Sequence, residues 1–200
     1  FDLVLLSPFG FSNTFALAIP QALSEELDVE TISELAPHAA DLRCGVSPEF
    51  LTRKDGFPGL KQLYGLEFES VRSMDHGLAY EGIESGEIEV VNAFSTDGKL
   101  LRYRLVVLED DQGFFPHYHA APLVRADTLA EHPELRPLLE RLALRLSAEQ
   151  MTELNYQVEE QKRSFARVAG DFLRAEGLLA GQRPQQQTTQ GARAQGFWAL

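Results

Sequence analysis

Short apolar runs rich in β-branched and aromatic residues alternate with segments of helical periodicity, and this alternation limits the folds open to the chain. A strand that is followed by a helix and then by another strand pairs with it in parallel through a right-handed crossover. We therefore predict an α/β fold with a parallel sheet, in which ligands bind at the strand ends. The predicted strands cover residues 3–6, 15–19, 68–72, 88–94 and 103–108.

Local signals mark several helix boundaries. Thr31 and Ser147 each begin a capping box, which predicts a helix start at both places. After residue 125 the strand pattern gives way to helices, the last of which begins near Phe165 and stops at Gly177. The other predicted helices cover residues 57–64, 74–85, 135–146 and 148–156.

The charge of the chain excludes some partners. There are 18 Lys and Arg against 30 Asp and Glu, which gives a net charge of −12. Such a surface repels phosphate backbones, so nucleic acid is not an expected partner, and it mildly favours cationic ligands. The single Cys44 excludes an intramolecular disulfide. The first residues form neither a signal peptide nor an initiating Met, so the chain looks cut from a longer one.

Aromatic and polar residues gather in four segments outside any amphipathic pattern, namely residues 7–15, 49–59, 92–98 and 110–122. Each lies near a predicted strand end, so the four can meet at one edge of the sheet. Phe15, Phe94 and Tyr118 offer π faces, which suit a quaternary ammonium because this ion cannot donate hydrogen bonds. Core packing is the alternative for any one ring, since the chain has 13 Phe and 5 Tyr.

Four motifs follow one another in a familiar order, at residues 12–17, 49–56, 94–98 and 108–118. They read Ser-Asn-Thr-Phe-Ala-Leu, Glu-Phe-Leu-Thr-Arg-Lys-Asp-Gly, Phe-Ser-Thr-Asp-Gly and Leu-Glu-Asp-Asp-Gln-Gly-Phe-Phe-Pro-His-Tyr. With these motifs the chain resembles the glycine betaine/choline/carnitine-binding proteins of osmoprotectant ABC transporters over residues 1–179.

The resemblance implies an α/β, type II periplasmic-binding-protein-like fold with the second lobe complete and the first lobe only partly present. In this reading residues 1–8 are a hinge crossing strand, residues 9–120 the second ligand-binding lobe, residues 121–180 the return crossing and C-terminal helices of the first lobe, and residues 181–200 a Gln-rich tail. The upstream part of a family member, which supplies one ring of the ligand cage, is missing. The sheet edge left open in this way predicts a dimer through the incomplete first lobe.

The resemblance also assigns the rings of the ligand cage. Phe15 and Phe94 stand where the family usually has tyrosines, while Tyr118 keeps the family's tyrosine. Phenylalanine retains the quadrupole that attracts a cation but has no hydroxyl. The cage is therefore expected to bind an ammonium group, with a ligand preference of its own.

Two polar residues complete the site that the resemblance implies. Asn13 matches a polar position at the ammonium end of the ligand. Arg53 matches an arginine that in some members binds a betaine carboxylate through a charge-assisted hydrogen bond. A salt bridge from Arg53 to Asp55 or Glu49 is the alternative.

The expected function is extracytoplasmic capture of glycine betaine, choline or a relative by lobe closure, for an ABC transporter permease. The expected location is the periplasm or the outer face of the cytoplasmic membrane, and no enzymatic activity, cofactor or metal is expected. A solute-sensing receptor domain with the same site is one alternative. A hydrolase built on Ser95 or Ser7 is another, but the chain has no Gly-x-Ser-x-Gly elbow.

Several remaining polar residues have plainer explanations. Asp97, Asp110 and Asp111 are expected in turns and at the hinge, because an aspartate beside glycine is most often a turn residue. His117 and His119 are two residues apart, so in a strand they would lie on the same face. Two histidines without a third ligand are nevertheless weak evidence for zinc.

Overall fold

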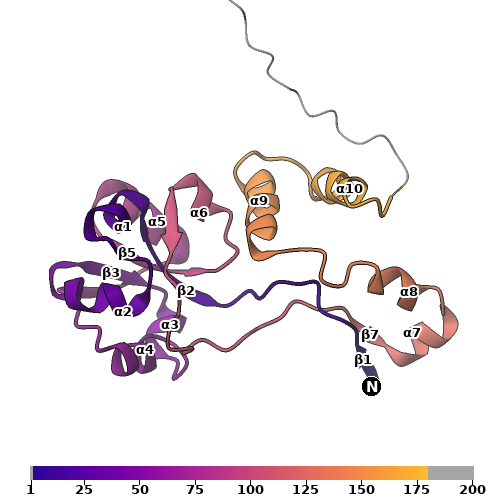
Figure 1. The fold of residues 1–200 in the computed structure, drawn as a ribbon, viewed down its shortest axis with the longest axis horizontal. Helices are drawn as coiled ribbons and strands as arrows, with labels where there is room; N and C mark the ends of the chain where they lie inside the picture. The colour runs from indigo at the N-terminus through magenta and orange to yellow at the C-terminus, as the bar shows by residue number, and fades with distance from the viewer. Residues whose placement is uncertain (1, 180–200) are drawn as a thin grey trace, which may run out of the picture.

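The computed structural model describes residues 2–179, which form two bodies joined by two extended segments (Figure 1). One body, here called the sheet body, holds strands β2 to β6 and helices α1 to α6. The other, here called the helical body, holds β1, β7 and helices α7 to α10. This arrangement agrees with the expected two-lobed α/β fold.

The sheet body is built on five strands in the order β4-β3-β5-β2-β6. β3 is parallel to β4 and β5, but β2 is antiparallel to β5 and β6. The prediction of a wholly parallel sheet is therefore wrong for β2. Helical crossovers link β3, β4 and β5 and impose parallel pairing, whereas β2 follows an extended segment and enters at the edge where β5 ends. The strands are β2 (Phe15–Pro20), β3 (Arg43–Val46), β4 (Ser70–Ser73), β5 (Val90–Phe94) and β6 (Leu105–Val107).

Both faces of this sheet are covered by helices. Successive residues of β2 point to opposite faces, so Leu17 packs in a larger core with Phe50, and Ala18 packs in a smaller core with Tyr80. Helices α2, α3 and α4 contribute to the larger core, and α5 and α6 to the smaller. The helices are α1 (Gln21–Leu27), α2 (Ile32–Leu35), the 3-10 helix η1 (Ala36–Asp41), α3 (Pro48–Thr52), α4 (Phe57–Tyr64), α5 (His76–Ser85) and α6 (Lys99–Arg102).

The helical body consists of a two-stranded antiparallel ribbon and four helices. The predicted helix at residues 135–146 ends early, because Leu144 turns into the left-handed region and donates its N–H to the carbonyl of Pro8 at 3.0 Å. That bond ties the helical body to the first connecting segment. The elements are β1 (Leu3–Leu5), β7 (Leu123–Arg125), α7 (Ala126–Glu131), α8 (Leu135–Glu140), α9 (Ala148–Glu159) and α10 (Phe165–Ala175).

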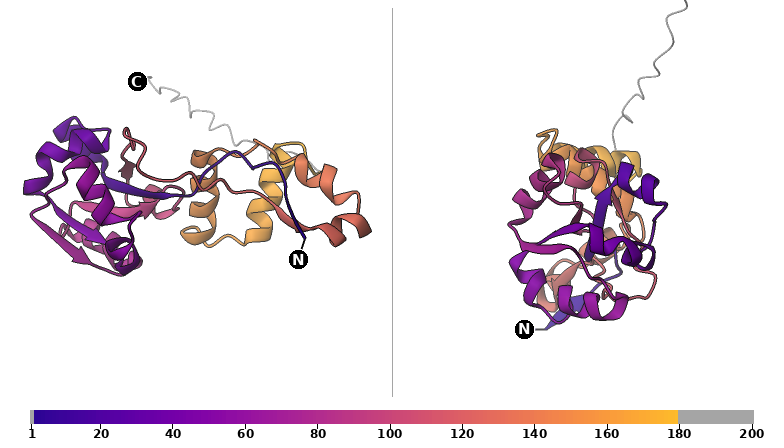
Figure 2. Two further views of the ribbon diagram at one scale, coloured as in Figure 1. Left: turned by 90° about the horizontal axis from the view of Figure 1, so that it is seen from below. Right: turned by 90° about the vertical axis from the view of Figure 1, so that its left-hand side faces the viewer.

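The two connecting segments, residues 6–14 and 116–122, run side by side between the bodies (Figure 2). Leu6 donates its N–H to Pro122 at 3.0 Å and Phe9 donates its N–H to Ala120 at 2.9 Å. A further bridge joins Ser12 to His119. The chain therefore leaves the helical body through residues 6–14 and returns to it through residues 116–122. These two paired segments are here called the link.

The predicted capping signals are confirmed. Thr31 and Ser147 both form capping boxes, and Gly65 ends α4 in the left-handed conformation. Strands β3 and β7 were not predicted, because each is short, and β3 contains Gly45. A Cβ at Gly45 would lie 2.4 Å from Ile88, so the glycine is needed for close packing. Over residues 2–179, no helix is long and apolar enough to cross a membrane. The Gln-rich tail lies outside the described residues.

Candidate functional site

The candidate site lies at one edge of the sheet, where β5 ends and β2 begins. Phe15, the first residue of β2, is the register partner of Phe94, the last residue of β5. Their rings stack with centroids 5.1 Å apart and an interplanar angle of 22°. This edge also faces the link, since residues 6–14 lead directly into β2. Two of the three predicted rings therefore meet beside the connection between the bodies.

The two stacked rings differ in accessibility. Phe15 is 9% exposed and also contacts Phe50, with ring centroids 5.0 Å apart. Phe94 is 36% exposed, so part of its ring is open to solvent. Phe15 is therefore mostly a core residue, which was the alternative prediction for each ring, whereas part of the Phe94 ring is accessible.

Arg53 lies next to the buried ring, with its guanidinium carbon 5.9 Å from the Phe15 centroid. Helix α3, capped by Ser47, positions it at the helix end. Its guanidinium donates to Asp55 at 2.6 and 2.8 Å and to Glu49 at 2.9 Å. These bonds raise the pKa of Arg53, and the guanidinium lowers the pKa of Asp55. The alternative prediction, a salt bridge from Arg53 to Asp55 or Glu49, is therefore confirmed for both carboxylates.

Tyr118 reaches the same group of charges from the second connecting segment. Its hydroxyl lies 3.4 Å from Oδ2 of Asp55, and its backbone N–H donates to the Ser12 hydroxyl at 2.8 Å. The side chain is 47% exposed. Asp55 therefore connects Tyr118 to Arg53.

Asn13 completes the set from the first connecting segment, and its side chain contacts the turn that follows Phe94. Its side-chain oxygen accepts a hydrogen bond from the Thr96 hydroxyl at 3.1 Å, and its backbone N–H donates to the carbonyl of Tyr118 at 3.1 Å. The structure thus brings all five predicted residues to one edge of the sheet body, from four separate stretches of sequence.

Asp97 has a larger part in this region than the predicted turn. Its N–H does close a turn onto the Phe94 carbonyl at 3.0 Å, as expected. Its carboxylate, however, also contacts His76 and accepts from the Tyr80 hydroxyl, each at 2.7 Å. Burial opposes ionisation, but these hydrogen bonds outweigh it and hold the pKa of Asp97 below its usual range. The motif Phe-Ser-Thr-Asp-Gly gave the only sequence signal for this residue, and nothing pointed to His76.

Asp110 organises the loop that leads to Tyr118. Its carboxylate accepts from the backbone N–H groups of Phe114 and Phe115 at 2.9 and 2.7 Å and from the Tyr64 hydroxyl. The expected loop position is correct, and the carboxylate fixes the path of the chain toward the site.

The other polar candidates have no shared site. The rings of His117 and His119 stack 5.7 Å apart, and both side chains are exposed. The Ser95 hydroxyl donates to the carbonyl of Ser12 at 3.2 Å and accepts from the N–H of Thr14 at 3.2 Å. Ser95 is therefore engaged with the backbone of the link.

Two bodies joined by two paired segments, with aromatic residues at the sheet edge beside the link, define a type II periplasmic-binding protein. A solved glycine betaine/carnitine/choline ABC transporter structure matches with a TM-score of 0.83 at 35% identity, over 89% of this chain and 65% of that chain. A structure of apo YehZ from Escherichia coli matches with a TM-score of 0.74 at 25% identity, over 89% of this chain and 67% of that one.

The family is equally clear. A model of the substrate-binding domain of the ABC-type glycine betaine transport system, OpuAC, matches residues 1–175, and the chain belongs to this family of solute-binding proteins, which are not enzymes. An ergothioneine transport permease/ergothioneine binding protein of Helicobacter pylori is 39% identical, over 89% of this chain and 32% of that protein. A glycine-betaine-binding protein of Pseudomonas aeruginosa is 37% identical, over 88% of this chain and 60% of that protein. The chain spans less than two thirds of either relative.

Proposed function

We propose that this chain captures a quaternary ammonium solute at the edge of the sheet body and belongs to an ABC importer. The observation that carries the proposal is the stacked pair of Phe15 and Phe94 next to the two connecting segments, with Tyr118 joined through Asp55 to the arginine that lies over Phe15. Aromatic faces attract a cation that cannot donate hydrogen bonds, and each contributes up to about 2 kcal/mol when desolvated. The solute is bound without chemical change.

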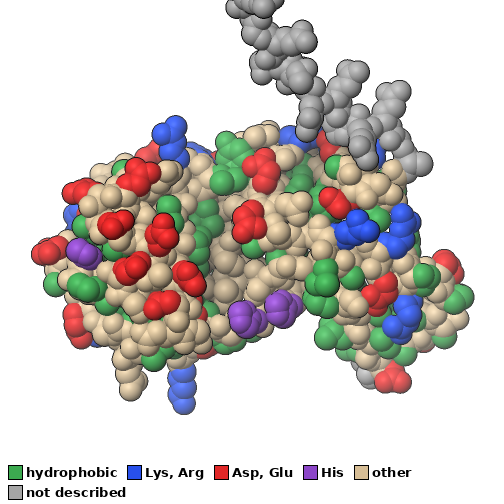
Figure 3. All heavy atoms as spheres, in the orientation of Figure 1, with side chains coloured by type: hydrophobic (Ala, Val, Ile, Leu, Met, Phe, Trp, Pro, Cys, Tyr) green, Lys and Arg blue, Asp and Glu red, His purple; other side chains and the backbone are tan. Residues whose placement is uncertain are grey.

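Charge supports the same choice of ligand. The chain has a net charge of −12, and acidic side chains are spread over the face of the sheet body seen in Figure 3. Such a field raises the local concentration of cations and disfavours anionic solutes. The aromatic pair then supplies the close contact that the field alone lacks.

Arg53 gives the site its second selectivity element. A betaine carries a carboxylate that an arginine binds by charge-assisted hydrogen bonds, whereas choline does not. Because Arg53 is already bound by Asp55 and Glu49, an incoming carboxylate has to share or replace one of these partners. The structure therefore favours a modest preference for betaines over choline.

Binding is proposed to close the two bodies onto the solute. In this proposal residues 1–8 are the first hinge crossing, residues 9–120 the closing lobe, and residues 121–180 the return crossing and C-terminal helices of the first lobe. The hydrogen bonds between segments 6–14 and 116–122 support a hinge at this place. A ligand that contacts both bodies stabilises the closed state through its higher affinity for that state. A permease then recognises the closed form outside the cytoplasm, in the periplasm or at the outer face of the cytoplasmic membrane.

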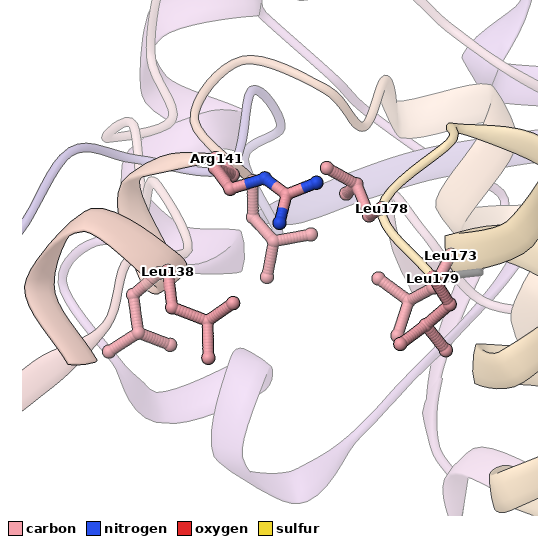
Figure 4. A pocket seen from close by; sticks show the side chains of 7 residues that line it. Leu138, Arg141, Leu173, Leu178 and Leu179 are labelled. Carbon is pink, nitrogen blue, oxygen red and sulfur yellow. The ribbon is translucent and has the colours of Figure 1, made fainter. Parts of the chain in front are cut away.

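The helical body has apolar surface that its own elements leave open. A cavity of about 230 Å³ lies among leucines from the α8 region and the end of α10, including Leu138, Leu173, Leu178 and Leu179 (Figure 4). In the two-stranded sheet of β1 and β7, three leucines are largely exposed, namely Leu3 at 52%, Leu5 at 69% and Leu123 at 60%. A surface of this kind favours association.

We propose that a second copy covers this surface when the chain is studied alone, which gives a dimer through the incomplete first lobe. Sedimentation at increasing concentration tests the dimer. A weight-average mass that stays monomeric throughout contradicts it.

Calorimetric titration tests the proposed function. The ligands are glycine betaine, choline, carnitine, proline betaine and ergothioneine, and the proteins are this chain and the same chain with the upstream segment of a family member restored. Saturable binding is expected in the restored protein. The neutral tert-butyl analogue of choline is the matched control, because it has the same shape without the charge. Equal affinity for choline and this analogue, or no binding by a folded restored protein, overturns the proposal.

A further inference from the structure

A polar cluster lies next to the Phe94 ring, outside the residues that the sequence assigned to the site. The imidazole of His76 lies 5.5 Å from the Phe94 ring, centroid to centroid, and its Nε2 atom is 2.7 Å from Oδ2 of Asp97. The same oxygen accepts the backbone N–H of Phe94 at 3.3 Å. Asp97 therefore holds both the backbone of Phe94 and the imidazole beside its ring.

The sheet topology places this cluster at the ligand edge. His76 is the first residue of α5 and follows β4, and Phe94 is the last residue of β5. Both strands are parallel to β3, so their C-terminal ends lie at the same edge of the sheet. The His76 side chain is 30% exposed and the Asp97 side chain 21% exposed. The pair is shielded by the fold but still accessible to protons.

We propose that His76 and Asp97 set the charge beside Phe94 and so determine how strongly the site prefers a ligand of net positive charge, an inference that rests on the proposed function. With a neutral imidazole the pair carries −1, and with a protonated imidazole it carries zero. Imidazoles change charge between about pH 5 and pH 8. A cation against Phe94 is attracted by the first state and not by the second.

This arrangement discriminates between ligand classes. Choline has a net charge of +1, whereas the carboxylate of glycine betaine offsets its ammonium charge. Choline therefore gains more from the −1 state than glycine betaine does. The affinity for choline, relative to glycine betaine, is expected to fall as the pH falls from 8 to 5. The hydrogen bonds that lower the pKa of Asp97 keep this carboxylate ionised across the range.

The other charged and titratable groups near His76 do not reverse this sign. Tyr80 stays neutral, because burial and Asp97 raise its pKa. Lys99 lies over the Tyr80 ring, with Nζ 5.5 Å from the ring centroid, and adds a positive charge next to the cluster. Burial and then Asp97 raise the pKa of Glu159, so this residue also loses negative charge as the pH falls. Asp75 caps α5 through the N–H of Gly77 at 3.0 Å.

The size of the effect is limited by distance and solvent. A unit charge roughly 10 Å from a bound cation changes affinity by about two- to tenfold at the effective dielectric constants of a partly exposed site. By linkage, binding of choline releases protons to the same extent that protons weaken binding. High salt reduces both effects.

The test uses the restored protein and calorimetric titration of choline and glycine betaine at pH 5, 6, 7 and 8. The wild type is expected to lose about two- to tenfold more affinity for choline than for glycine betaine between pH 8 and pH 5. His76→Gln keeps a polar group beside Asp97 and removes the imidazole, so most of the pH dependence of the ratio is expected to be lost. His76→Phe is the second variant, used if His76→Gln lowers the unfolding temperature. Titration in two buffers of different ionisation enthalpy gives the protons released.

Matched variants test whether another titratable group causes the pH dependence of the affinity ratio. His38→Gln lies on η1, away from the ligand edge, and is expected to keep the wild-type pH profile. His117→Gln and Glu159→Gln each remove one further titratable group of this region. The inference is overturned if His76→Gln and His76→Phe keep the wild-type profile, or if His117→Gln or Glu159→Gln alone flattens it. Absence of binding at every pH overturns the proposed function as well, which distinguishes the two failures.

Discussion

The guanidinium of Arg53 lies 5.9 Å from the ring of Phe15, so the protein places its own cation beside a ring proposed to receive a ligand cation. Asp55 and Glu49 hold the guanidinium in that position. Under the proposed function a zwitterionic ligand is expected to suit this arrangement, because its carboxylate can replace a protein carboxylate on Arg53 while its ammonium group contacts the aromatic faces. Charge and aromatic contact are thus arranged side by side at one sheet edge.

Arg53→Ala is expected to weaken binding of glycine betaine roughly tenfold more than binding of choline, because one charge-assisted hydrogen bond is lost only with the betaine. Calorimetric titration of both ligands measures the two ratios. Lys54→Ala removes the same charge from the adjacent residue and is the control. Equal losses for both ligands contradict the role of Arg53.

Tyr118→Ala is expected to weaken every quaternary ammonium ligand, by about tenfold or more, because an aromatic face is lost. Tyr118→Phe keeps that face and removes only the long contact with Asp55, so its affinity is expected to remain near that of the wild type. Replacing the exposed neighbour in His117→Ala provides the control. If Tyr118→Phe is as weak as Tyr118→Ala, the hydroxyl and not the ring carries the effect.

Alanine substitutions at Phe15 and Phe94 are expected to have different effects, the first mainly on stability and the second mainly on ligand binding. Phe15→Ala removes a ring that is 9% exposed and packed on Phe50, which costs about 3–5 kcal/mol of unfolding free energy. Phe94→Ala removes a ring that is 36% exposed, so binding falls with a much smaller loss of stability. Urea unfolding and ligand titration of both variants measure the contrast. A Phe94→Ala protein that binds as the wild type does rules out this ring as a ligand contact.

Asp97→Asn is expected to lower the unfolding free energy by about 1–3 kcal/mol at pH 7, because Tyr80 and His76 lose an ionised acceptor. The folded-state pKa of Asp97 is depressed, so its contribution is present above the unfolded pKa and is lost as the pH falls through the folded pKa. The difference between wild type and variant is therefore expected to shrink near pH 3. Urea unfolding at pH 7 and pH 3 measures it, with exposed Asp41→Asn as the control. A difference that is the same at both pH values contradicts the assignment.

Gly98→Ala is expected to disturb the contact between the two bodies. A Cβ at Gly98 would lie 2.5 Å from the backbone nitrogen of Tyr156 in α9, where Asn155 also donates to the Thr96 carbonyl at 2.8 Å. We expect a loss of about 1–3 kcal/mol in thermal or urea unfolding. Gly77→Ala, whose Cβ meets only ordinary contacts, is the control. Equal stability of the two variants shows that α9 moves freely from the sheet body.

Motifs and local signals predicted much of the site. The segments around Phe15, Arg53, Phe94 and Tyr118 were recognisable because each combines aromatic and polar residues outside a helical or strand period. The capping boxes at Thr31 and Ser147, the stop at Gly65 and the family itself were also correct. These features depend on residues close together in the chain, which a single sequence displays directly.

Other features depended on residues that are distant in the sequence. The direction of β2 follows from where its chain enters the sheet body, and the early end of α8 follows from the bond between Leu144 and Pro8. The contact between His76 and Asp97 joins residues 21 positions apart, on either side of α5 and β5, and has no local pattern. No periodicity in a sequence encodes such contacts.

The sequence by itself determined the α/β character, several helix boundaries, the family and the chemical types of the candidate site residues, because propensity, capping and motif spacing are local properties. Only the tertiary structure decided that Phe15 pairs with Phe94, that Arg53 is bound by two carboxylates, and that His76 stands behind the ligand edge. The physical reason is that strand register, ion-pair partners and burial are set by the packing of whole elements, which brings together side chains that the chain itself keeps far apart.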